Sequence, residues 1–143
     1  MEPLSVGVIL YCVDKNTPFF LLLKHNKTIY GWNHWDFVKG KPIKNETEIQ
    51  TALREVVEET NLKEVKIKPN FRAISKYSFI KNSGEKAYKE VIYFLGEINK
   101  NDKNKVKISN EHERYEFVRI EKVKDYIEFD EMKKVFDEVI KYF

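Results

Sequence analysis

The amino-acid sequence predicts an α/β sandwich built on a mixed β-sheet. Runs of β-forming residues lie on both sides of a strongly periodic helical segment, and a second helical pattern closes the chain. Strands that bracket one helix and precede another favour helices packed on a shared sheet. The 143 residues, 42% of them hydrophobic, predict a single domain over residues 1–143.

The first elements are strands. Residues 4–13 are rich in β-forming side chains, and the apolar residues 19–24 follow after a turn-like segment, so the two runs predict a hairpin. Residues 25–33 are an expected loop. The short apolar run at residues 34–38 comes next, and the chain breaks at residues 39–42 because Gly40 and Pro42 interrupt regular structure.

A helix follows this break. Its apolar residues recur at helical spacing and predict one buried stripe, formed by Ile49, Ala52, Leu53, Val56 and Val57. Asn61 lies just past the last turn and suits the left-handed conformation that ends many helices.

The second half of the chain contains further strands and a closing helix. Residues 71–80 and 87–98 predict two long strands joined by a turn, and residues 115–120 predict a last strand. Residues 99–105 are an expected polar loop with no capacity to pack. The tail has apolar residues at helical spacing: Met132, Val135, Phe136, Val139, Ile140 and Phe143.

Composition excludes several classes of protein. Ten Phe, eight Tyr and two Trp are too many for a disordered chain. The single cysteine, Cys12, excludes an internal disulfide framework and a cysteine-based zinc site, and we expect it to be a small core residue. No apolar run approaches the ~20 residues of a membrane span. We therefore expect a soluble cytoplasmic protein, monomeric and without membrane contact.

Charge is unevenly distributed along the chain. Residues 46–60 hold five glutamates and one arginine, a net charge of −4 in a chain whose net charge is +3. An acidic patch in a basic chain indicates a metal cation beside an anionic ligand, or else a solvated acidic helix face. The 22 lysines and four arginines are scattered, which favours compositional bias over nucleic-acid binding.

Three glutamates of the predicted helix share one face. Glu55, Glu58 and Glu59 are spaced i, i+3 and i+4, within about 100° of arc, and we expect this face to point away from the core. Their mutual repulsion and the helix dipole both disfavour the arrangement, whereas a hard cation such as Mg2+ or Mn2+ would stabilise it. Arg54 can pair with Glu58, which would leave Glu55 and Glu59 for the metal.

The glutamates are part of a longer motif. Residues 40–62 fit the pattern G-x5-E-x7-R-E-U-x-E-E-x-G-U, where U is a bulky aliphatic residue, at eight of its nine fixed positions. This segment resembles the Nudix box of nucleoside diphosphate-X hydrolases. Asn61 replaces the second glycine, and because Asn also tolerates a left-handed backbone we expect the turn to survive.

The resemblance extends beyond the box. The segment WDFVKG before it and the segment SNEHERYEF near the C-terminus resemble those of asymmetrical diadenosine tetraphosphate hydrolases. This resemblance implies a Nudix-type α/β/α sandwich, a requirement for Mg2+ or Mn2+, and a dinucleoside polyphosphate substrate. It implies cleavage of diadenosine tetraphosphate to ATP and AMP.

The same resemblance implies roles for individual residues. It assigns metal binding and catalysis to the box and to one glutamate beyond it, with the residues Gly40, Arg54, Glu55, Glu58, Glu59 and Glu111. It assigns substrate binding to a histidine at the mouth of the site, two lysines facing phosphate and two aromatic residues stacking adenine, namely His34, Lys39, Lys89, Tyr77 and Tyr115. Glu46 has an expected structural role at the helix start. His112 has an expected role in orienting Glu111.

Two alternative functions stay open at this point. The basic remainder of the chain is compatible with a pyrophosphohydrolase acting on RNA 5′ ends. The departure at Asn61 is a hint of a catalytically weak nucleotide-binding sensor, although the complete set of box carboxylates argues against it.

Overall fold

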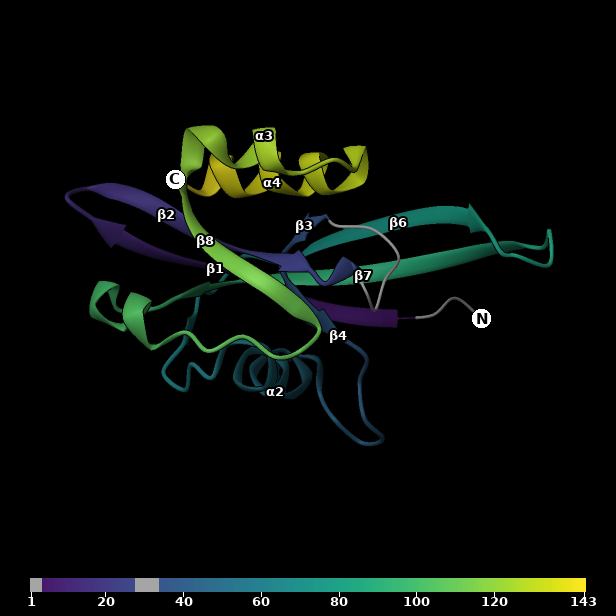
Figure 1. Ribbon diagram of the computed structural model, residues 1–143, viewed down its shortest axis with the longest axis horizontal. Coiled ribbons are helices and arrows are strands. Elements are labelled where there is room, and N and C mark those ends of the chain that lie inside the picture. The colour runs from purple at the N-terminus through teal and green to yellow at the C-terminus, as the bar shows by residue number, and fades with distance from the viewer. Residues whose placement is uncertain (1–3, 28–33) are drawn as a thin grey trace.

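Helices cover both faces of a mixed sheet in the computed structural model, which describes residues 4–27 and 34–143 (Figure 1). The strands of this sheet are β1 (Leu4–Asp14), β2 (Thr17–His25), β3 (Trp35–Asp36), β4 (Val38–Gly40), β5 (Lys66–Ile67), β6 (Ala73–Ile80), β7 (Lys86–Glu97) and β8 (His112–Arg119). The helices are α2 (Glu48–Thr60), α3 (Val123–Tyr126) and α4 (Asp130–Tyr142), with 3-10 helices η1 (Lys100–Lys105) and η2 (Ile120–Lys122). The predicted α/β/α sandwich is confirmed. Residues 28–33, most of the predicted loop, lie outside the described residues.

The sheet is arranged around β1. Its strand order is β3-β2-β1-β7-β5, with β4 paired to β1, β6 to β7 and β8 to β2. β1 runs parallel to β7, and the other pairs in the described part of the chain are antiparallel. α2 lies on one face, and α3 and α4 lie on the other (Figure 1). No helix in residues 4–27 and 34–143 is long and apolar enough to cross a membrane.

The predicted hairpins are confirmed. β1 and β2 are joined by Lys15 and Asn16, which both have positive φ, as the tight turns that suit twisted strands require. β6 and β7 are joined through a turn that contains Gly84, whose φ is 87°. The last strand, β8, begins at His112 and not at residue 115, because it continues to pair with β2.

Two apolar clusters form the core, one on each face of the sheet. Alternate residues of β1 serve them: Val8 and Cys12 pack on the α2 side, whereas Ile9 and Tyr11 pack on the α4 side. A strand buried on both faces reads as a continuous apolar run. Cys12 is fully buried, as predicted. α4 contributes Met132, Val135, Phe136 and Val139, while Ile140 remains exposed.

The segment at residues 99–105 differs from expectation. It forms η1, whose first turn is capped by the Asn99 side chain accepting from the Asn101 amide at 2.9 Å. Lys103 places its Nζ 5.0 Å from the ring centre of Phe19 and 5.7 Å from that of Phe117. A cation over aromatic faces gives this polar segment a packing contact.

α2 is rotated about its axis relative to the predicted stripe. Ala52 and Val56 are buried as expected, but the other three members, Ile49, Leu53 and Val57, are each at least 36% exposed. Thr51, Thr60 and Glu59 are buried instead. The carboxylate face therefore does not point away from the core, because one edge of it is turned toward the sheet.

Both ends of α2 are fixed by local hydrogen bonds. Thr47 and Gln50 form a capping box, in which the side chain of each accepts from the backbone N–H of the other. Asn61 has φ 63° and donates its N–H to the Val57 carbonyl at 2.9 Å. The left-handed end predicted for Asn61 is confirmed.

Candidate active site

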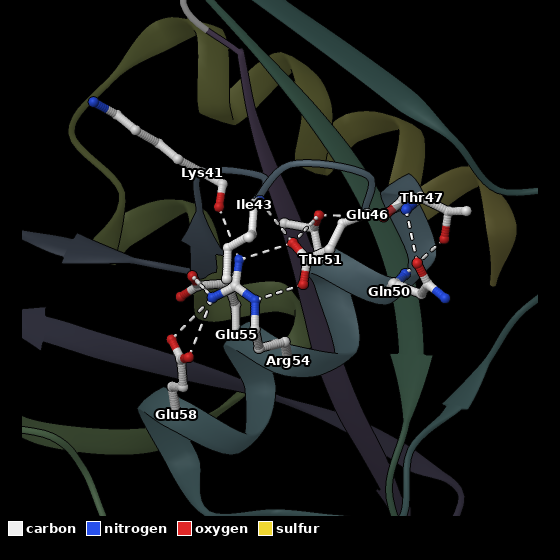
Figure 2. Close-up of polar contacts among 9 residues, drawn as sticks. All are labelled: Lys41, Ile43, Glu46, Thr47, Gln50, Thr51, Arg54, Glu55 and Glu58. Carbon is white, nitrogen blue, oxygen red and sulfur yellow. Dashed lines mark hydrogen bonds and ion pairs between the residues drawn. The ribbon is translucent and has the colours of Figure 1, made fainter.

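Glu46 and Arg54 join the loop before α2 to the helix itself (Figure 2). Glu46 Oε2 accepts from Arg54 Nε at 2.7 Å, and Oε1 accepts from the Ile43 amide and the Thr51 hydroxyl, each at 2.8 Å. Arg54 also donates to the Lys41 carbonyl at 2.8 Å. The hydrogen bond from Arg54 lowers the pKa of Glu46 to about 2. Glu46 thus has the bracing position expected for it.

Arg54 also contacts two glutamates of the acidic face. Its Nη1 lies 3.1 Å from Glu58 Oε2, which is the expected i, i+4 pair, and 2.8 Å from Glu55 Oε1. The second contact differs from expectation, since Glu55 was predicted to be left to a metal alone. One guanidinium therefore sets the positions of both carboxylates (Figure 2).

Gly40 lies directly against Glu55. A Cβ atom built at residue 40 would overlap the Glu55 carboxylate. β4 ends at Gly40, and its pairing with β1 brings this backbone to the edge of α2. Only a residue without a side chain allows this close approach between the strand end and the carboxylate.

Glu59 is the buried member of the acidic face. It is 4% exposed, and its Oε2 has no hydrogen-bond partner among the described residues. Burial raises the pKa of Glu59, and the neighbouring Glu55 and Glu111 carboxyls raise it further. A cation would offset both effects, because it stabilises the ionised form of a buried carboxylate. The residues present therefore fit a metal ion.

Glu111, the residue before β8, and His112, the first residue of β8, lie beside Glu59. Glu111 is exposed and His112 is buried, and one ligand atom from each lies within 4.8 Å of the others and of a Glu59 oxygen. Burial, and then the nearby His25, lower the pKa of His112 to about 4. The imidazole is therefore neutral near pH 7.

The carboxylates line a cavity of about 550 Å³. Acidic residues from α2 and from the turn before β8 line it together with basic residues from β4, from the position after β4 and from β7. The charged residues that line it are Lys39, Lys41, Glu55, Glu58, Glu59, Lys89 and Glu111. Gly40 and His25 line it as well. Such a cavity can hold a cation and an anionic group side by side.

A second cavity, of about 520 Å³, adjoins the first. Its lining is more aromatic and includes the predicted residues His34 and Tyr77 together with Phe79, Phe129 and Met132. Lys39, Lys89 and His25 line both cavities, so they stand between the two. Tyr77 and Lys89 are direct partners in the β6–β7 ladder.

Lys39 is held by a buried carboxylate that sequence reasoning missed. Its Nζ donates to Asp36 Oδ2 at 2.9 Å, and His25 Nε2 lies 3.2 Å from the same oxygen. Burial acts to raise the pKa of Asp36, but Lys39 and His25 outweigh it and the net shift is downward. For Lys39, burial acts to lower the pKa and Asp36 raises it above its ordinary value. Both groups are therefore charged.

Tyr115 is the one predicted substrate-binding residue that lines neither cavity. It packs with Phe117 on the α2 side of the sheet, opposite Leu23 in the β2–β8 ladder. The alternation of side chains along β8 sends it to this face. Phe129, the residue before α4, is one of the aromatic residues that line the second cavity with Tyr77. Its position depends on a turn between helices, for which the sequence carries no pattern.

Nearly all of the chain matches a family of known proteins. A family model described as the NUDIX domain matches residues 1–140. The chain belongs to the Nudix family.

Relatives within the Nudix family are also similar over most of the chain. The asymmetrical bis(5′-nucleosyl)-tetraphosphatase of Rattus norvegicus is 32% identical over 128 residues, covering 88% of this chain and 81% of the relative. That of Sus scrofa is 34% identical over the same shares. A structure of C. elegans Ap4A hydrolase in a binary complex has a TM-score of 0.82 and 25% identity, covering 98% and 96% of the two chains. The predicted resemblance and the prediction of a Nudix pyrophosphohydrolase are confirmed.

Proposed function

We propose that this Nudix protein hydrolyses dinucleoside polyphosphates, with diadenosine tetraphosphate converted to ATP and AMP. The observation that carries the proposal is the pair of adjoining cavities, one acidic and one aromatic, with Lys39 and Lys89 between them. A polyphosphate placed along this pair would have its phosphates at the carboxylates and one nucleoside among the aromatic rings. The named activity of the rat and pig relatives supports the same substrate class.

The acidic cavity would hold Mg2+ or Mn2+. Glu55, Glu58, Glu59 and Glu111 would supply carboxylate oxygens, and Gly40 would supply its carbonyl. These oxygens are the ligands that such hard cations prefer. When bound, the metal would neutralise phosphate oxygens and lower the pKa of a coordinated water. A glutamate of this set would accept the proton of the attacking water.

The basic residues would position the phosphate chain. The Lys39 ammonium has three N–H donors and uses one on Asp36, so it can also donate to a phosphate oxygen. Lys89 lies on the same wall, opposite Tyr77 in the sheet. Arg54 would act indirectly, since its hydrogen bonds are to Glu46, Glu55, Glu58 and the Lys41 carbonyl.

The aromatic cavity would bind one adenine. Tyr77 and Phe129 offer ring faces from different elements, β6 and the segment before α4. His34 lies at the same cavity, with its ring centre 5.6 Å from that of Phe129. Stacking on aromatic rings contributes about 1–3 kcal/mol per base and tolerates different bases. Tyr115 has no part in this proposal.

Product analysis tests the proposal. We expect metal-dependent formation of ATP and AMP from diadenosine tetraphosphate, with Glu59→Gln lowering kcat at least about 100-fold while the far-UV circular dichroism is unchanged. Glu48→Gln is the matched control, because Glu48 lies on the same helix and pairs with Arg72, away from both cavities. Wild-type turnover in Glu59→Gln would contradict the site.

The alternatives give different results in the same assay. Release of pyrophosphate from 5′-triphosphorylated RNA, with no turnover of dinucleoside polyphosphates, would favour the RNA 5′-end enzyme. Binding of nucleotide without turnover under any divalent metal would favour the sensor. The cytoplasmic location and the monomeric state stay predictions.

A further inference from the structure

His112 lies at the buried end of the carboxylate cluster. Its side chain is 1% exposed, and its Nε2 is 3.7 Å from Glu59 Oε1. Backbone hydrogen bonds fix this position: the His112 amide donates to the Ser109 carbonyl at 3.1 Å, and the Asn26 amide donates to the Glu111 carbonyl at 2.9 Å. The imidazole is therefore held beside Glu59 by the start of β8.

A hydrogen bond does not account for this placement. N–H···O bonds in proteins span about 2.7–3.2 Å, shorter than the separation of His112 from Glu59. Among residues 4–27 and 34–143, neither ring nitrogen of His112 has a hydrogen-bond partner, and Glu59 Oε2 has none. Buried polar atoms without partners are costly, so the pair calls for a third group between them.

A metal ion would fill this role. Two ligand atoms about 2.1 Å from one tetrahedral ion lie about 3.4 Å apart, close to the 3.7 Å between His112 Nε2 and Glu59 Oε1. A carboxylate oxygen of Glu111 lies within 4.8 Å of the other two ligand atoms.

A second group with metal-binding residue types is less suited to an ion. It consists of His25, His34 and Asp36, but Asp36 already accepts a hydrogen bond from Lys39 Nζ at 2.9 Å. That carboxylate therefore has a cation as its partner. Glu59 has no basic residue within ion-pair distance other than His112, among the described residues.

We propose that His112 Nε2 is a metal ligand shared with Glu59 and Glu111, and that this site selects a transition metal over Mg2+. The proposal deepens the proposed function and rests on its metal site, for which the box glutamates and Gly40 supply oxygen ligands alone. An imidazole nitrogen suits ions such as Co2+ and Zn2+, whereas Mg2+ prefers oxygen ligands and keeps several waters.

Pulsed electron paramagnetic resonance of the Mn2+-loaded protein tests the nitrogen ligand directly. We expect coupling of Mn2+ to a 14N nucleus in the wild type. The coupling should be lost in His112→Gln and retained in His34→Gln, the matched control from the second histidine group. The wild-type spectrum is informative whether or not either variant folds.

Calorimetric titration tests the selectivity. We expect His112→Gln to bind Co2+ at least about tenfold more weakly than the wild type, with a smaller change for Mg2+. An equal loss of affinity for the two ions would overturn the selectivity for a transition metal.

The outcomes separate this proposal from the proposed function. Wild-type binding of Mn2+ without nitrogen coupling overturns the ligand role of His112 and leaves the pyrophosphohydrolase intact. Loss of the coupling in His34→Gln and not in His112→Gln also overturns it. Failure of the wild type to bind any of the three metals overturns both.

Discussion

The buried pair of Asp36 and Lys39 predicts an asymmetry between two single substitutions. The Asp36 side chain is only 1% exposed, whereas the Lys39 side chain is 21% exposed and lines both cavities. Lys39→Met would leave a buried carboxylate without its ammonium partner, holding only the Phe37 amide on Oδ1 at 2.7 Å and, on Oδ2, His25 at 3.2 Å and His34 at 4.0 Å. Asp36→Asn would leave an ammonium that can turn toward a cavity. The first change should therefore cost more stability.

The magnitudes follow from this difference in burial. Removing one partner of a buried ion pair costs about 3–5 kcal/mol, and we expect Lys39→Met to lie at the lower end because His25 remains. Asp36→Asn should cost about 2 kcal/mol, the loss of one charged hydrogen bond. The double variant should be more stable than Lys39→Met alone, since no unpaired charge is left behind.

Urea unfolding at neutral pH, followed by tryptophan fluorescence, measures all four free energies of unfolding. Unchanged m-values would show that the shifts in midpoint report stability alone. Equal losses in the two single variants, or a double variant whose loss equals their sum, would refute the reasoning that one charge is trapped and the other is not.

Three further predictions concern the box and the aromatic cavity. Gly40→Ala would put a methyl group where the Glu55 carboxylate lies, so kcat should fall about 100-fold with an unchanged circular dichroism spectrum; wild-type kcat would contradict the contact. Tyr77→Ala and Phe129→Ala should each raise the KM for diadenosine tetraphosphate about 5- to 150-fold in steady-state kinetics, and an unchanged KM would remove that ring from the site. Because the pKa of Glu46 is lowered to about 2 from 4.5, its ionised form contributes stability above pH 4.5 that is lost as the pH falls toward 2. Urea unfolding should therefore show a wild-type advantage over Glu46→Gln at pH 6 that shrinks at pH 3, and a constant difference would argue against the Arg54 contact.

Local patterns predicted most of the elements correctly. Lys15 and Asn16 occupy the positive-φ turn of the first hairpin, and Asn61 takes the left-handed end of α2. The two Asn positions follow from the tolerance of Asn for a left-handed backbone, which does not depend on the rest of the fold, whereas the two-residue turn imposes a positive φ on Lys15. The spacing within residues 40–62 likewise predicted which glutamates lie together.

The rotation of α2 could not be predicted from apolar spacing. Thr60 is fully buried and donates its hydroxyl to the Val56 carbonyl at 2.6 Å, so it needs no solvent. Glu59 is buried beside it, although the spacing of the apolar residues predicts that this position is exposed. A hydrophobicity pattern cannot predict the burial of a polar residue that forms its hydrogen bonds within the helix or that would bind a cation.

The partners of the predicted substrate-binding residues could not be predicted, for a different reason. His25 lies on β2 and Phe129 precedes α4, so each meets its partner, Asp36 or Tyr77, only when separate elements pack together. Asp36 is only three residues from Lys39, but its burial depends on the pairing of β3 with β2. Tyr115 was predicted to stack adenine because of its resemblance to a motif. The alternation of side chains along β8 places it on the α2 side of the sheet, whereas Tyr77 packs on the α4 side. Long-range packing, and not local propensity, determines these positions.

The two cavities are built on parts of the sheet that differ in how many neighbouring strands they pair with. The acidic cavity is built on β4 and α2 beside β1, which has strand neighbours on both of its edges. Tyr77 belongs to β6, whose ladder in the described chain is with β7 alone, and its neighbours Phe79 and Ile80 are exposed. Regions with fewer buried contacts open at a lower free energy than the centre of a fold. This outer hairpin can thus fray while the carboxylates of the acidic cavity keep their arrangement.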